Sequence, residues 1–197
     1  MSVMKGMMPG SSAPRSVFDR PLQPKSKGEV SASAFGYLYC AIFDYTKGRS
    51  QKQTEIASRL EALGIDVGSR VLELLMYREK DRKRETRVAS MFQFITGTVW
   101  PYLFNKTAQL VKYSDDTRPY GIRDSEPLTS MFMSLNPDWK NFDSAVFIRG
   151  IVKGIFTAAE FPCNVICYPK NDGLIEFIPT FEPVVVERER IKGKSSS

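Results

Sequence analysis

The stretch Gly64–Thr86, GIDVGSRVLELLMYREKDRKRET, is where the organisation of this chain is clearest. Apolar side chains recur in it at positions i, i+4, i+7 and i+8: Val67, Val71, Leu74 and Leu75. This spacing predicts a helix with one apolar face. Gly68 costs that helix about 1 kcal/mol relative to alanine, which indicates that another backbone packs closely against it. Gly64 is expected to end or kink the preceding helix, and Arg70 and Glu73 can pair across one turn.

The second half of the stretch is a highly charged loop, 78–87, in which six of ten residues are basic and three are acidic. Such a loop can contact an acidic protein or an anionic lipid surface, or it can simply be solvated. The interleaved acids argue against nucleic acid, because they would face phosphates. Thr86 is expected to cap the next helix with its hydroxyl.

Length and composition favour one domain with tails. The 197 residues have a net charge of +6, which suits an acidic partner, although basic side chains that only solvate tails and a loop give the same balance. Segment 1–28 is rich in Pro, Ser, Gly and Met and is predicted to be a disordered basic arm. A single domain is predicted over 29–187, followed by a disordered tail at 188–197.

Hydrophobic periodicity divides this domain into a helical first part and a mixed second part. Helices are predicted at 31–48, 51–63, 66–77, 88–104 and 143–160. Strands and turns are predicted at 109–113, 118–123 and 128–134, with a hairpin formed by 165–168 and 174–178. Gly150 and Gly154 have the spacing Gly-x-x-x-Gly, which lets another element approach closely. The sequence therefore predicts an α+β fold, with several helices packed on a small, mostly antiparallel sheet.

The first predicted helix carries more aromatic area than a surface helix usually needs. Four large apolar residues recur in it at spacings of three, four and three: Phe35, Leu38, Ile42 and Tyr45. Tyr37, Tyr39 and Phe43 extend the apolar surface beyond that stripe. One side of this helix can therefore face another protein, or the helix can be a well-buried part of the core. The pattern leaves both interpretations open.

Side chains suited to catalysis are scarce. The chain has no histidine, which excludes Ser-His-Asp and Cys-His arrangements and histidine metal sites. Cys163 and Cys167 are expected to be small buried hydrophobes. The chain has no Gly-rich phosphate-binding loop and no apolar run long enough to cross a membrane. The sequence therefore predicts no enzymatic activity, no cofactor and no metal, with only peripheral or indirect membrane contact.

Several long motifs occur in a fixed order: GEVSASAF at 28–35, the Gly-x-x-Val-Gly-x-Arg-Val-Leu-Glu-Leu-Leu run at 64–75, Arg-Glu-Thr at 84–86, Gly-Thr-Val-Trp at 97–100 and FIRGIVKGIF at 147–156. With these motifs the chain resembles the Bet-three-like family of subunits of the transport protein particle (TRAPP), a vesicle-tethering complex. The resemblance spans about residues 28–187. Its central motif residues are Gly64, Val67, Gly68, Arg70, Glu73, Arg84, Glu85 and Thr86.

The resemblance implies helices packed on a twisted antiparallel sheet and a non-catalytic structural role. Such a subunit helps assemble the guanine-nucleotide exchange factor for a Rab GTPase in transport from the endoplasmic reticulum to the Golgi. Family members pair through their first two helices, which implies a partner interface at Phe35, Leu38, Tyr39, Ile42 and Tyr45. The implied partners are the founding Bet-three subunit and a sedlin-type subunit 2. The implied location is cytoplasmic, peripheral at the endoplasmic reticulum and cis-Golgi.

Two features depart from the family pattern. Pro101 follows the tryptophan where the family usually has a basic residue, and it should kink the helix near its end. The founding member carries an acylated cysteine in the loop before Arg-Glu-Thr, whereas 78–84 holds no cysteine, so no acylation is expected there. A lipid- or small-ligand-binding module stays open as an alternative function.

Overall fold

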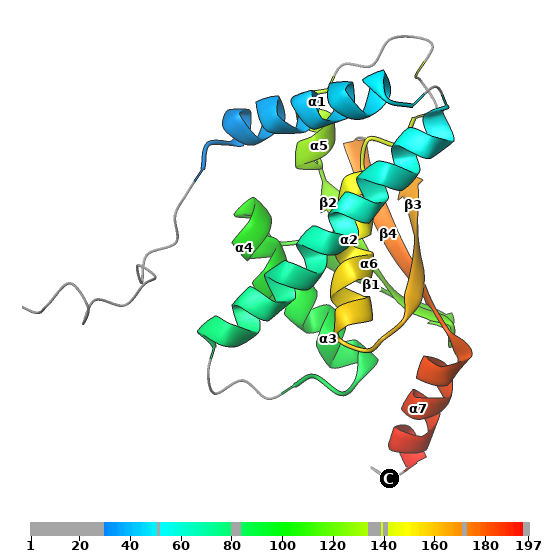
Figure 1. The fold of residues 1–197 in the computed structure, drawn as a ribbon. Helices are drawn as coiled ribbons and strands as arrows, with labels where there is room; N and C mark the ends of the chain where they lie inside the picture. Colours follow the sequence, from blue (N-terminus) through cyan, green and yellow to red (C-terminus); the bar gives the residue numbers. More distant parts are fainter. Residues whose placement is uncertain are drawn as a thin grey trace, which may run out of the picture. The chain divides into compact units, whose positions relative to one another are not determined.

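The computed structural model describes residues 30–50, 52–79, 84–133, 139, 142–170 and 173–194. The chain divides into two units, Met1–Val30 and Ser31–Ser197, and the described residues other than Val30 all belong to the second. That unit places a set of helices against one face of a four-stranded sheet (Figure 1). The predicted arm 1–28 and the middle of the charged loop, at 80–83, lie outside the described residues.

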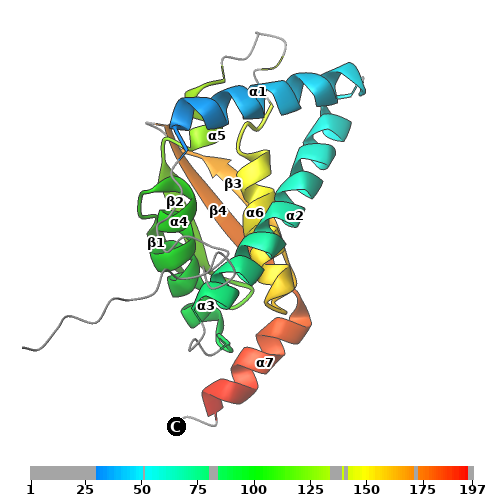
Figure 2. The same cartoon turned by 60° about the vertical axis from the view of Figure 1, so that its left-hand side comes forward.

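Two long helices begin the second unit. Helix α1 spans Ala32–Gly48, and its first turn is capped by the Ser31 side chain, which accepts a hydrogen bond from the backbone amide of Ala34. Helix α2 spans Gln53–Arg78. The two helices are adjacent where α1 ends and α2 begins, and from there they diverge, as Figure 2 shows.

The predicted helix at 88–104 is present but irregular. It consists of helix α3 at Val88–Phe94, a π-helical turn at Ile95–Val99 and helix α4 at Trp100–Phe104. Pro101 has no amide to donate to the preceding turn, so the regular α-helical pattern gives way to the π-helical turn just before it. Asn105 then ends the helix in the left-handed conformation, with φ of 52°.

The sheet is antiparallel throughout, with strand order β1-β2-β4-β3. Its strands are β1 at Gln109–Asp115, β2 at Arg118–Ser125, β3 at Cys163–Pro169 and β4 at Leu174–Phe181. Three further helices complete the unit: α5 at Leu128–Met131, α6 at Val146–Ala158 and α7 at Pro183–Lys194. The predicted α+β architecture is confirmed.

The core lies between the helices and the sheet. Helix α6 is apolar on nearly all sides and fully buried along most of its length, with α2 on one side and β3 on another. Its Phe156 ring lies 4.9 Å from Phe92 of α3 and 5.3 Å from Phe181 of β4, measured between ring centroids. Phe177 of β4 packs on Trp100 at 5.8 Å. One aromatic cluster thus joins the helices to the sheet.

Three local predictions were wrong. Gly64 neither ends nor kinks a helix, because α2 runs through it without interruption. The segment predicted as a strand or turn at 128–134 begins with the short helix α5. The end of the chain was predicted to be disordered from residue 188, but α7 continues to Lys194. Helix α7 contacts the start of α3 through Glu189 and the segment just after α6 through Arg188, and such contacts between distant segments leave no local signal.

Candidate partner interface

Helix α1 has a buried side and an exposed side, and the predicted interface residues are divided between them. Tyr39 is only 2% exposed, and its hydroxyl donates to the backbone carbonyl of Ser144 at 3.0 Å. Its ring packs on Phe147 of α6, with Phe35 stacked beside it. Burial raises the pKa of Tyr39, and Asp143 adds to that effect. Tyr39 and Phe35 therefore anchor α1 to the core.

The other predicted residues lie toward solvent. Leu38 and Tyr45 are 59% and 62% exposed, and Ile42 is half-buried between the two sides. Tyr37, which the predicted interface omitted, is 80% exposed. Together with two exposed alanines they form one side of the helix, which we call the α1 face: Ala34, Tyr37, Leu38, Ala41, Ile42 and Tyr45. The Arg49 guanidinium lies over the Tyr45 ring at the end of this face, 4.5 Å from the ring centroid. The recurrence of Ala34, Leu38, Ala41 and Tyr45 at i, i+4, i+7 and i+11 was the signal in the sequence.

The two glycines of the central motif lie where α2 crosses α6. A Cβ atom on Gly64 would lie 2.2 Å from the carbonyl oxygen of Phe147, and one on Gly68 would lie 2.2 Å from that of Ile151. In α6, a Cβ atom on Gly150 would lie 2.3 Å from the carbonyl oxygen of Glu61, and one on Gly154 would lie 2.2 Å from that of Ile65. The predicted close backbone approach is confirmed for both helices. Alanine cannot be placed at these positions without moving a backbone.

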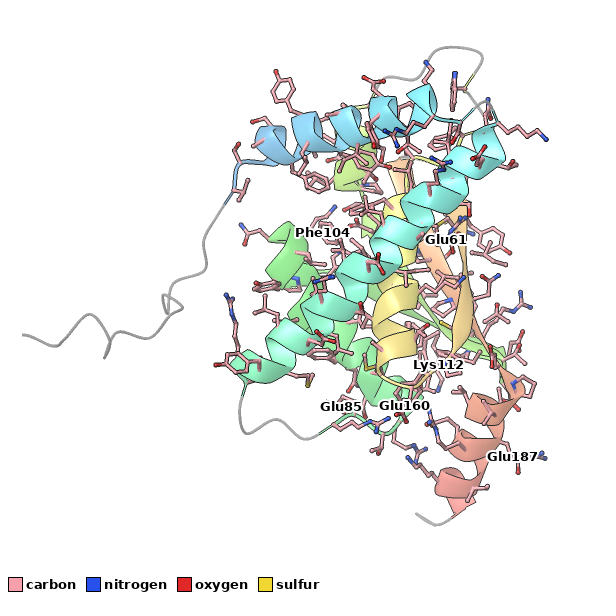
Figure 3. The ribbon with its side chains drawn as sticks, viewed as in Figure 1. Glu61, Glu85, Phe104, Lys112, Glu160 and Glu187 are labelled. Carbon is pink, nitrogen blue, oxygen red and sulfur yellow. The ribbon has the colours of Figure 1, made fainter. Side chains whose placement is uncertain are left out.

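Charges on α2 are arranged differently on its two sides. Glu61 faces α6 (Figure 3), where it pairs with Arg149 at 2.8 Å and with Lys153 at 3.3 Å. Arg70 and Glu73 are exposed, and the structure forms no ion pair between these two described residues, although their spacing allows one. Val67 is half-buried beside them. One side of α2 is therefore closed against α6 and the other is open.

The Arg-Glu-Thr motif connects three segments at the opposite end of the unit. Arg84 donates to the carbonyl of Ala159 at the end of α6 and pairs with Glu160 at 2.7 Å. That pairing lowers the pKa of Glu160 below its ordinary value. Glu85 is half-buried beside Arg84 in the chain, and the carbonyl of Thr86 accepts a hydrogen bond from Lys192 of α7.

Thr86 does not cap α3, contrary to the prediction. The free amide of Val88 instead donates to the carboxylate of Glu189 at 2.9 Å, and Glu189 also binds Arg87 at 3.1 Å. A carboxylate suits a helix N-terminus because the free amides there carry partial positive charge. This cap comes from α7, about a hundred residues further along the chain, so local sequence could not reveal it.

With this geometry established, a comparison with protein-family models identifies the chain. The model for the transport protein particle (TRAPP) component matches residues 35–178. The chain belongs to the TRAPP family. Among curated proteins it is 37% identical to trafficking protein particle complex subunit 5 of Dictyostelium discoideum, over 90% of this chain and 98% of that protein. It is 36% identical to subunit 5 of Homo sapiens, over 84% and 88%.

A solved structure agrees with the TRAPP fold. Trafficking protein particle complex subunit 3 from Naegleria fowleri matches with a TM-score of 0.69 and 14% identity, over 77% of this chain and 95% of that chain. At this identity the match supports the fold alone. That protein was crystallised covalently bound to palmitic acid. The present TRAPP chain has no cysteine at 78–84, and the absence of acylation there stays a prediction.

The three cysteines of this TRAPP-family chain form no disulfide, and two of them lie in β3. Burial raises the pKa of the Cys163 thiol to about 12 and also raises the pKa of Cys167. Neither thiol is therefore activated as a nucleophile. In the described ranges, no three side chains of the metal-binding types gather to hold an ion. Among the helices described, none is both long enough and apolar enough to cross a membrane.

Proposed function

We propose that this chain is a non-catalytic structural subunit of the TRAPP vesicle-tethering complex. In that role it helps assemble the guanine-nucleotide exchange factor for a Rab GTPase in transport between the endoplasmic reticulum and the Golgi. Family membership and the similarity to subunit 5 proteins support a place in the complex. The expected location is cytoplasmic, peripheral at the endoplasmic reticulum and cis-Golgi.

The observation that carries the proposal is the α1 face. It presents six apolar residues without a charge, and three of its side chains are more than half exposed: Tyr37, Leu38 and Tyr45. Contiguous apolar surface of this kind is typical of protein–protein contacts. We therefore assign the α1 face to pairing with the founding Bet-three subunit. A sedlin-type subunit 2 is the second proposed partner, and the Rab GTPase is reached through the assembled complex.

The test is the solution mass of the purified chain, alone and mixed with the founding Bet-three subunit, by light scattering on a sizing column. We expect a one-to-one complex that Leu38→Asp abolishes. Val184→Asp is the matched control, because Val184 is 63% exposed on α7 and carries the same change far from α1 in the sequence. No complex with the unmodified chain, or equal loss in both variants, would contradict the proposal.

The exchange-factor role has a separate test. The isolated chain should not accelerate nucleotide release from a Rab GTPase, whereas the assembled complex should. Omitting this chain from a reconstituted complex should reduce the exchange rate by reducing the amount of complex formed. Exchange activity of the isolated chain would overturn the non-catalytic assignment.

A further inference from the structure

The hydroxyl of Thr86 has no structural role in the described part of the chain. Its predicted role as the cap of α3 is taken by the carboxylate of Glu189, which binds the Val88 amide. The Thr86 side chain is exposed, and its hydroxyl forms no hydrogen bond with any described residue. It lies in 84–86, a segment that is neither helix nor strand. An enzyme can therefore reach this hydroxyl without opening a helix or a strand.

Three basic side chains lie close to Thr86, either along the chain or in space. Arg84 stands two residues before it and Arg87 one residue after it. Lys192 comes from α7, and its amine donates to the backbone carbonyl of Thr86 at 2.8 Å. Thr86 is therefore an exposed hydroxyl in a basic environment. Protein kinases select their substrates by such charge patterns, and an acidic substrate groove suits this one.

The acids of this junction already have basic partners. Glu160 pairs with Arg84 at 2.7 Å, and Glu189 pairs with Arg87 at 3.1 Å. Both side chains of the first pair are exposed, so the pair is weak and Arg84 can exchange its partner. A phosphate carries about two negative charges at neutral pH. It therefore competes better than a single carboxylate for Arg84, and better than an uncharged carbonyl for Lys192.

We propose that Thr86 is a phosphorylation site, at which the added phosphate binds Lys192 and Arg84 and fastens α7 to the segment before α3. In the reaction, the Oγ atom of Thr86 forms a bond to the γ-phosphorus of ATP. The bond from that phosphorus to the bridging oxygen breaks, ADP leaves with the electron pair, and the hydroxyl proton passes to a carboxylate of the kinase. The proposal does not depend on the partner assigned to the α1 face.

The first experiment treats the full chain with magnesium, ATP and the catalytic subunit of the cyclic-AMP-dependent protein kinase, which selects hydroxyls near basic residues. Mass spectrometry of the digested chain should place a phosphate on Thr86, and Thr86→Val should remove it. Thr117 is the internal control, because it is exposed but follows two acids, Asp115 and Asp116, and it should stay unmodified. No phosphate on Thr86, or as much on Thr117, would overturn the proposal.

The second experiment measures hydrogen–deuterium exchange in α7 before and after phosphorylation. The phosphate should slow this exchange by about 10-fold, because it gives Lys192 a charged partner in place of a carbonyl. Lys192→Met removes the charge and should abolish most of the slowing, although Thr86 is still phosphorylated. Ile191→Met is the matched control, because Ile191 is exposed beside Lys192, and it should keep the slowing. Unchanged or faster exchange in α7, or slowing that Lys192→Met leaves intact, would contradict the fastening of α7.

Discussion

Two helix surfaces of this chain differ in how far packing within the chain buries them. Where α2 crosses α6, four glycines bring the two backbones together, and no side chain would fit between them. On the α1 face, aromatic and aliphatic side chains of ordinary size are exposed to solvent. The first surface is already satisfied within the chain and serves stability. The second leaves apolar side chains exposed, although the Arg49 guanidinium lies 4.5 Å from the Tyr45 ring centroid, and we propose that it serves association.

The largest expected effect separates two glycines that undergo the same substitution. Gly64→Ala places a Cβ atom 2.2 Å from the Phe147 carbonyl oxygen, so α2 and α6 must move apart at a cost of about 2–3 kcal/mol. Gly97→Ala meets nothing within 4 Å and should be stabilising by up to about 1 kcal/mol. Urea unfolding measures both. Equal effects of the two substitutions would contradict the close crossing.

The next effect compares adjacent residues on opposite sides of α1. Tyr39→Ala removes a ring that is 2% exposed and should lower the free energy of unfolding by about 3 kcal/mol. Leu38→Ala should change it by less than about 0.5 kcal/mol, because Leu38 is exposed. Thermal unfolding of the isolated chain is sufficient to measure this difference. A large loss of stability in Leu38→Ala would contradict the exposure of that side of α1 and would indicate that it is part of the core.

A smaller effect concerns the carboxylate that caps α3. Glu189→Ala removes the acceptor for the Val88 amide and the partner of Arg87, at an expected cost of about 1 kcal/mol. Glu187→Ala, on the exposed side of the same helix, should be nearly neutral. If both variants unfold at the same urea concentration, α7 does not cap α3.

The last effect is a dependence on alkaline pH, which is absent near neutral pH. The folded chain holds the Cys163 proton up to a pKa of about 12, whereas the unfolded thiol ionises near its ordinary value of about 8.5. Stability from this group is therefore complete below that ordinary value and declines as pH rises above it. The free energy of unfolding is measured between pH 8.5 and 10.5 in reducing buffer. In Cys163→Ala it should decline less steeply with pH, by roughly the slope that corresponds to the loss of one proton on unfolding. An unchanged slope would contradict the burial of this thiol.

The sequence was sufficient where one segment determines its own structure. The helix at 31–48 and the hairpin of β3 and β4 follow from periodicity and turn residues, and the structure confirms both. Gly64 was misread because a glycine can either end a helix or admit a close neighbour, and the neighbour here is α6, far along the chain. The capping of α3 by Glu189 was missed for the same reason.

The interface was only partly predictable from the sequence. Periodicity identified α1 as unusually apolar. Leu38 and Tyr39 are adjacent in the helix but point to different sides of it, and only the contacts of Tyr39 with Phe147 and Ser144 show which side is buried. The prediction therefore included Tyr39 and Phe35, which anchor the helix, and omitted Tyr37, which is exposed. The chemistry of a helix surface is readable in the sequence, whereas its orientation depends on the packing of the whole unit.

The most direct test of the account is hydrogen–deuterium exchange of residues 32–48, compared between the isolated chain and its complex with the founding Bet-three subunit. We predict slower exchange in α1 on assembly and, to a smaller extent, in the stretch 63–77 of α2, with little change in β1 or α7. Unchanged exchange in α1, together with protection elsewhere in the same complex, would contradict the assignment of the α1 face to pairing.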